Sequence, residues 1–228
     1  MGEVQVLKNF SPSLDLTSLA ALIPEQTGTE KKLAELEAYI KPQIFWREMT
    51  VDYINKRELS LDQGRFLIDS AYVAIGLRNC QKATLFAITL DKDLPQYSQF
   101  CLEEGRLWES TIADILGSNA IEMMAEKFHN YLVGMNLPKG LFSTLRFSPG
   151  YGDWELSQQK EIISYLETGD VIKVNENYLL EPVKSITALI GWSNFPQANN
   201  YPQGEKRKGF CQGSGSCVHC TTWACRKN

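Results

Sequence analysis

One stretch, residues 118–151, constrains the fold more than any other part of the sequence. Apolar residues first recur at helical spacing on one face of the chain: Ile121, Met124, Ala125, Phe128 and Leu132. The segment LFSTLRF at 141–147 then alternates between two faces, as a β-strand does. Pro149-Gly150 ends this strand, because proline and glycine favour turns. The stretch therefore predicts a helix that faces the core, a strand directly after it, and a tight turn.

The rest of the chain places helices before strands. We expect helices over 29–41, from about 60 to 78, from about 94 with an interruption at 117–119, and over 157–168. Strands are expected over 83–90, 171–174, 177–180 and 183–192. The helix from Ser60 rests on a capping box, Ser60-Leu61-Asp62-Gln63. The order predicts an α+β domain over 1–192, followed by a Gly-, Pro- and Asn-rich tail over 193–228.

Composition excludes several classes of protein. The net charge of −4 gives no basic stripe for a nucleic-acid partner. No window approaches the roughly 20 apolar residues that a membrane span needs, and the charged N-terminus is not a signal peptide. We expect a soluble, cytoplasmic protein without nucleic-acid or membrane partners.

The turn from Arg146 to Tyr151 is a candidate ligand site. Strict alternation puts Arg146 on the same face of its strand as Thr144. Arginine supplies a planar fork for a carboxylate, and tyrosine supplies an aromatic face or a hydroxyl. A strand that runs into a Pro-Gly turn can present unpaired N–H and C=O groups, because Gly150 has no Cβ to block a ligand. A plain turn explains the same residues.

The preceding helix carries a second hint. Glu122, Glu126 and Asn130 are spaced by four residues, away from the apolar stripe. Two carboxylates at this spacing repel each other, and a cationic group such as a sulfonium or an ammonium would offset the repulsion. A solvated acidic face is the alternative. His129 has no partner at ligand spacing and is expected to be structural.

Four cysteines cluster in the tail: Cys211, Cys217, Cys220 and Cys225. In a cytosolic protein, clustered cysteines bind metals more often than they form disulfides. The four cysteines could bind zinc or an iron–sulfur cluster. A redox-active cysteine pair and a tail without a metal are the alternatives. Cys80 and Cys101 lie in partly apolar segments and are expected to be structural.

Several motifs together resemble the activation domain of cobalamin-dependent methionine synthase. They are RFSPGYGDW at 146–154, LLEPVKSITALIG at 179–191, the stretch LRNCQKATLFAITL and the helix GSNAIEMMAEKF. The resemblance covers about 60–192 and is strongest at 146–154, whereas 1–59 match poorly. Stand-alone relatives are similar in ending with a C-x2-C-x4-C tail.

This resemblance implies a helical, C-shaped α+β domain around a twisted antiparallel sheet. It implies that Arg146, Ser148, Gly150 and Tyr151 bind S-adenosylmethionine, with Glu126 as an acidic contact. The cobalamin belongs to a corrinoid partner or a short methionine synthase, whose inactive cob(II) form is reduced and then methylated from S-adenosylmethionine. Flavodoxin or ferredoxin would supply the electron.

The resemblance thus predicts a component of methyl transfer in methionine biosynthesis that has no catalytic residue of its own, since the sulfonium and the corrinoid carry the chemistry. The alternative is a corrinoid-protein adaptor that has a metal-binding tail and does not bind S-adenosylmethionine. An independent methyltransferase is disfavoured, because no glycine-rich methyltransferase loop or general base stands out.

Overall fold

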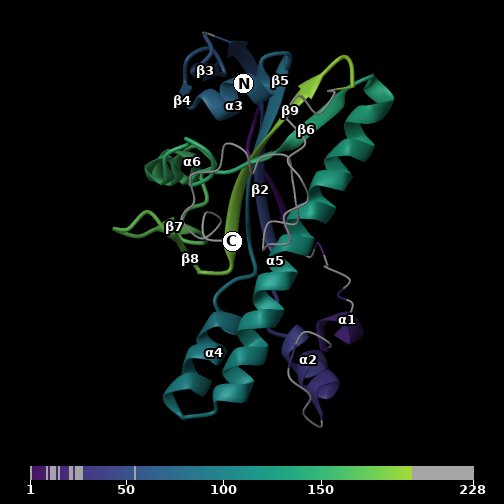
Figure 1. Ribbon diagram of the computed structural model, residues 1–228, viewed down its shortest axis with the longest axis vertical. Helices are drawn as coiled ribbons and strands as arrows, with labels where there is room; N and C mark the ends of the chain where they lie inside the picture. The colour runs from purple at the N-terminus through teal and green to yellow at the C-terminus, as the bar shows by residue number, and fades with distance from the viewer. Residues whose placement is uncertain are drawn as a thin grey trace, which may run out of the picture.

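The computed structural model describes residues 2–8, 10, 14, 16–20, 23, 28–53 and 55–196. Within them, seven strands form an antiparallel sheet in the order β4-β3-β2-β5-β9-β6, with β1 paired to one end of β2, and β7 and β8 form a separate hairpin (Figure 1). The strands are β1 (Gln5–Lys8), β2 (Gln43–Tyr53), β3 (Glu58–Leu61), β4 (Phe66–Asp69), β5 (Lys82–Thr89), β6 (Phe142–Phe147), β7 (Lys173–Val174), β8 (Leu180–Glu181) and β9 (Ser185–Ser193).

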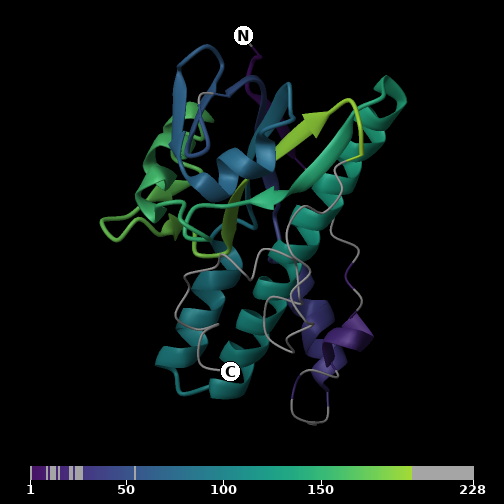
Figure 2. The same ribbon diagram turned by 45° about the horizontal axis from the view of Figure 1, so that its top comes forward.

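The helices cover both faces of this sheet and extend beyond it. They are α1 (Leu16–Ala20), α2 (Thr29–Glu37), α3 (Ala71–Leu77), α4 (Asp93–Glu103), α5 (Leu107–Asn136) and α6 (Gln159–Tyr165), with short 3-10 turns η1 (Leu137–Lys139) and η2 (Leu156–Gln158). The long α5 runs beside the sheet and continues past its end, where it lies against α4 and α2 (Figures 1 and 2). Helices and an antiparallel sheet thus share one structure, which confirms the α+β prediction.

The core lies on the two faces of the sheet. Successive residues of β5 alternate between them: Leu85 and Ala87 pack with α3 and α6, whereas Phe86 and Ile88 pack with α5. A third apolar cluster joins α2, α4 and the first half of α5 beyond the sheet. No helix of the described residues is long and apolar enough to span a bilayer.

The helix predicted from Ser60 is wrong. Ser60 lies buried in β3, and β3 and β4 form a hairpin whose turn contains Asp62 and Gln63, with φ angles of +52° and +62°. The helix begins ten residues later, where the hydroxyl of Ser70 accepts a hydrogen bond of 3.1 Å from the N–H of Val73. A helix cap is therefore present, but at the second serine of the segment.

The predicted interruption at 117–119 is also wrong, because α5 is continuous there. Lys184 lies across the helix: its Nζ donates hydrogen bonds to Asp114 at 2.6 Å and to Ser118 at 2.8 Å. A Cβ on Gly117 would lie 3.0 Å from the Cε of Lys184. The glycine makes room for a crossing side chain and does not end the helix.

Five other predictions, two helices and three strands, are confirmed with changed bounds. The helix at 29–41 ends at Glu37, and the helix expected from Ser157 begins at Gln159, after a 3-10 turn. The strands at 83–90, 141–147 and 183–192 appear as β5, β6 and β9. The sequence reading missed β2, although this strand pairs with β5 near the centre of the sheet.

One buried hydrogen bond between neighbouring strands gives a test of this packing. The indole N–H of Trp192 donates to the hydroxyl of Thr84 at 2.8 Å, and both side chains are buried. Thr84→Val keeps the shape but leaves the indole N–H unpaired, so we expect the free energy of unfolding to fall by about 1–3 kcal/mol. Urea denaturation measures this loss. Thr111→Val on the exposed face of α5 is the control, with an expected change within about 0.5 kcal/mol; equal losses in the two variants would contradict the prediction.

Candidate functional site

Arg146 lies near the end of β6, an edge strand of the sheet. Thr144 is buried on the α3 face, where its hydroxyl accepts a hydrogen bond of 2.9 Å from the N–H of Gly191. Arg146 instead reaches α5 on the opposite face. The predicted strict alternation is therefore wrong, because the pairing of β6 with β9 shifts between Ser143 and Arg146. This irregularity turns the Arg146 side chain toward the long helix.

The partner of Arg146 on α5 is Glu122. Their Nη2 and Oε2 atoms are 3.7 Å apart, too far for a hydrogen bond, and the Glu122 side chain is well exposed. Nη1 of Arg146 is buried and has no hydrogen-bond partner among the described residues. Glu126, one turn further along α5, is exposed and forms no ion pair within the same part of the chain. The guanidinium, whose side chain is 27% exposed, thus has an unused donor.

His129 adds a second buried polar group next to Arg146. Its Nε2 has no hydrogen-bond partner among the residues that the structure describes. Burial, and then the positive charge of Arg146, lower the pKa of His129 from 6.5 to about 4. The imidazole is therefore neutral at neutral pH. It can accept a hydrogen bond beside the guanidinium without repelling it.

This low pKa predicts a pH dependence of stability. The unfolded chain binds the His129 proton near the ordinary pKa of 6.5, whereas the folded chain binds it only near 4. The free energy of unfolding should therefore decrease as the pH falls from 6.5 toward 4. Denaturation at several pH values should show a smaller decrease between pH 6.5 and 5 in His129→Gln. An identical decrease in both proteins would show that this histidine titrates normally.

The turn after β6 uses several of its own polar groups. The N–H of Gly150 donates to the carbonyl of Trp154 at 2.8 Å, and the N–H of Tyr151 donates to the carbonyl of Ser148 at 3.3 Å. The hydroxyl of Ser148 donates to the carbonyl of Thr187 on β9 at 2.7 Å. The expectation of unpaired N–H groups is thus wrong at Gly150 and Tyr151. The Tyr151 side chain is half exposed, which leaves its ring accessible.

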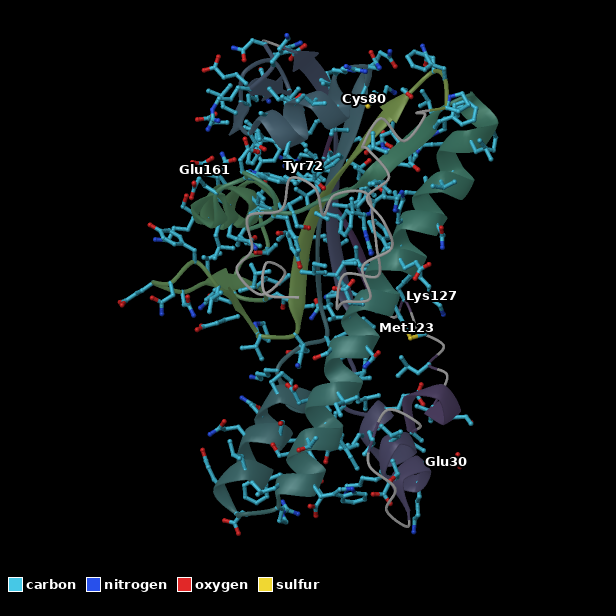
Figure 3. The ribbon with its side chains drawn as sticks, in the orientation of Figure 1. Glu30, Tyr72, Cys80, Met123, Lys127 and Glu161 are labelled. Carbon is cyan, nitrogen blue, oxygen red and sulfur yellow. The ribbon has the colours of Figure 1, made fainter. Side chains whose placement is uncertain are left out.

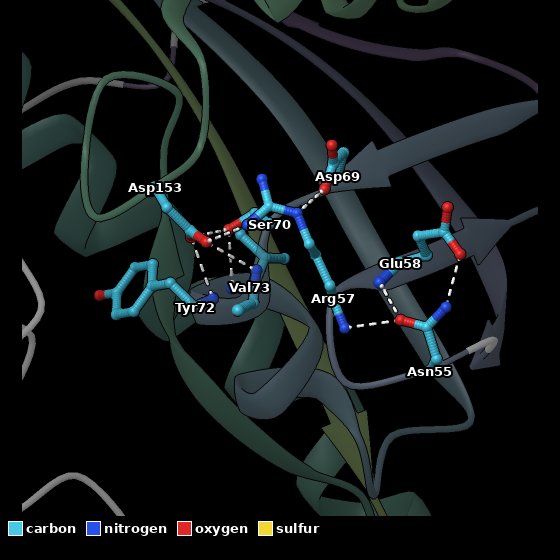
Figure 4. Close-up of polar contacts among 9 residues, drawn as sticks. Asn55, Arg57, Glu58, Asp69, Ser70, Tyr72, Val73 and Asp153 are labelled. Atoms are coloured by element: carbon cyan, nitrogen blue, oxygen red, sulfur yellow. Dashed lines mark hydrogen bonds and ion pairs between the residues drawn. The ribbon is translucent and has the colours of Figure 1, made fainter.

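Asp153 holds this turn against the start of α3 (Figure 4). One carboxylate oxygen accepts from the hydroxyl of Ser70 at 2.5 Å and the N–H of Tyr72 at 3.1 Å, and the other accepts from the N–H of Ala71 at 2.9 Å. Burial raises the pKa of Asp153, but these hydrogen bonds outweigh it and hold the pKa below its ordinary value. The sequence reading missed this anchor, because Ser70, the N-cap of this helix, lies 83 residues before Asp153 in the chain.

Comparison with solved structures shows similarity to the crystal structure of the MetH reactivation domain bound to AdoHcy. The match covers 83% of this chain and 78% of that chain, with a TM-score of 0.58 and 11% sequence identity. The chain shares the fold of the MetH reactivation domain. No protein-family model matches the sequence, and no curated protein matches it either.

The four tail cysteines, Cys211, Cys217, Cys220 and Cys225, lie outside the described residues, so the metal prediction stays a prediction. Among the residues that the structure describes, no group of three or more His, Cys, Asp or Glu side chains could hold a metal ion. Cys80 and Cys101 are buried and form no disulfide. Burial raises the pKa of Cys80 to about 12, which keeps this thiol protonated and unreactive.

Proposed function

We propose that this chain binds S-adenosylmethionine beside Arg146 and supports the reductive methylation of a separate corrinoid protein. The buried guanidinium N–H of Arg146, unpaired among the described residues, is the observation that carries the proposal. The fold adds support, since the MetH reactivation domain has been crystallised with AdoHcy, which differs from S-adenosylmethionine by the transferred methyl group.

The residues fit such a ligand. The Arg146 guanidinium would bind the methionyl carboxylate through charge-assisted hydrogen bonds. Glu122 already lies at 3.7 Å from this guanidinium, and it would meet the ligand's ammonium or sulfonium, with Glu126 one turn away. The backbone of Ser148 and Gly150 and the half-exposed ring of Tyr151 would hold the nucleoside. The resemblance predicted Glu126 as the acidic contact. In this proposal Glu122 is the main acidic contact, because it lies next to Arg146, and Glu126 is the second.

The chain would contribute position and not acid–base chemistry. S-adenosylmethionine supplies a methyl group on a sulfonium that needs no proton transfer in order to react. The turn is rigid because Asp153 and the Ser148 hydroxyl tie it to α3 and β9. A ligand on this turn would keep a fixed orientation toward a docked corrinoid, which is the source of catalysis by proximity.

The partners follow from the same proposal. The cobalamin would be carried by a corrinoid protein or a short methionine synthase, and flavodoxin or ferredoxin would deliver the electron. The tail cysteines would hold zinc or an iron–sulfur cluster, in a protein of the cytoplasm. An adaptor that does not bind S-adenosylmethionine is the less favoured alternative, since it gives no role to the Arg146 guanidinium.

A reconstitution tests the function. A cobalamin-binding fragment of a methionine synthase, loaded with cob(II)alamin, is mixed with a chemical reductant and methyl-labelled S-adenosylmethionine, with and without this chain. We expect the chain to accelerate transfer of label to the corrinoid, and Arg146→Ala to remove the acceleration. Binding of S-adenosylmethionine without faster transfer would contradict the proposed reactivation and leave only a binding module.

A further inference from the structure

A polar groove lies on the opposite side of the sheet from Arg146 and α5. It has a volume of about 490 Å³ and is formed by β2, the β3–β4 hairpin and α6. Glu161 of α6 marks this side in Figure 3, whereas Met123 and Lys127 mark α5 on the other. The volume falls within the range of small-molecule sites, about 300–1,000 Å³.

Arg47, in the middle of β2, lines this groove. It is only 5% exposed, which is unusual for arginine because burying a guanidinium costs solvation energy. Its Nη2 donates a hydrogen bond of 2.8 Å to the carboxylate of Glu167, and its guanidinium lies 4.6 Å from the centre of the Tyr165 ring. Its Nε is buried without a hydrogen-bond partner among the described residues. These contacts hold the guanidinium in place but leave one donor unused.

Further donors line the same groove as Arg47. Arg65 comes from the hairpin, and Lys160 and Ser164 come from α6. Three cations and two carboxylates line the groove, which gives the lining residues a net charge of +1. A third carboxylate, Asp62, lies 3.7 Å from Arg65 beside the groove. Several donors on different elements suit a tetrahedral oxyanion better than a planar carboxylate, because they approach from different directions.

Glu167 supplies an anionic partner for the buried Arg47 in the absence of a ligand. Its side chain is 68% exposed, yet its carboxylate bonds the buried Arg47. A side chain that projects into solvent can move away at small cost, so its carboxylate can give way to another anion. We propose that this groove is a second ligand site, for a small phosphate-bearing molecule that replaces Glu167 on Arg47.

A titration with inorganic phosphate at constant ionic strength tests the proposal, followed by calorimetry or phosphorus NMR. We expect saturable binding. Glu167→Gln should tighten it by about 3- to 10-fold, because the competing charge is removed. The double variant Arg65→Ala/Lys160→Ala should weaken it by roughly 10-fold or more. Both of these side chains are exposed, so the double variant avoids the folding defect that Arg47→Ala would risk.

Two controls separate this site from non-specific attraction and from the proposed function. Lys173→Ala removes an exposed cation paired with Asp170 outside the groove, and should leave phosphate binding unchanged. Arg146→Ala should also leave it unchanged. Absence of saturable binding, equal weakening in Lys173→Ala, or no tightening in Glu167→Gln would each overturn the proposal. The last result would assign the Arg47–Glu167 pair to holding α6 on the sheet.

Discussion

Replacing Gly152 with alanine is expected to destabilise the protein by about 2–5 kcal/mol. The φ angle of Gly152 is +63°, where an L-residue is strained. An added Cβ would also lie 2.8 Å from two ring atoms of Tyr72. That ring is buried and packs against Phe147 with ring centres 5.1 Å apart, so it has little room to move. Urea denaturation measures the loss of stability.

Gly169→Ala is the matched control for the cost of placing an L-residue at a positive φ angle. Its φ angle is +60°, nearly the same as at Gly152, but no atom lies within 4 Å of its added Cβ. We expect this variant to lose only about 1 kcal/mol. The difference between the two variants isolates the contact with Tyr72. Equal losses would mean that the turn after β6 is not packed against α3 as described.

Arg146→Ala is expected to weaken binding of S-adenosylmethionine by about 3 kcal/mol, roughly 100-fold. The variant removes the charge and the donors that would meet the carboxylate. Arg146→Lys should recover only part of the affinity, because an ammonium cannot form the planar two-point contact. Equilibrium dialysis with labelled ligand measures these affinities.

Two glutamate variants test the geometry of the same site. Glu122→Gln should weaken binding more than Glu126→Gln, because Glu122 is the carboxylate next to Arg146. The two side chains lie one turn apart on α5 and are both exposed, so they are matched in helix context. The opposite order would restore Glu126 as the main acidic contact and would contradict the arrangement described for Arg146.

Local patterns predicted two elements with one-sided or complete burial, although the buried strand β2 was missed. The stripe from Ile121 to Leu132 is buried against the sheet, and the apolar run at 83–90 is the central strand β5. The prediction for 58–78 failed because the capping box at Ser60 lies in the β3–β4 hairpin. The helix is instead capped at Ser70, whose hydroxyl also donates to a distant group, Asp153. Such long-range contacts leave no local sequence signature.

The candidate site was predictable in its chemistry but not in its geometry. The sequence pointed to Arg146 and to the acidic face of the preceding helix. It could not show that the pairing shift in β6 turns Arg146 toward α5, since alternation alone puts it with Thr144. The sequence also could not choose between Glu122 and Glu126, because the two residues are four positions apart and lie on the same face of the helix. The choice depends on where β6 crosses the helix.

Calorimetric titration of S-adenosylmethionine into the unmodified protein, in parallel with Arg146→Ala, tests the central claim most directly. We predict saturable heat for the unmodified protein and its loss in the variant, with both proteins showing the same circular dichroism. No heat with the natively folded unmodified protein, or equal binding by both proteins, would contradict the claim that Arg146 holds the methyl donor.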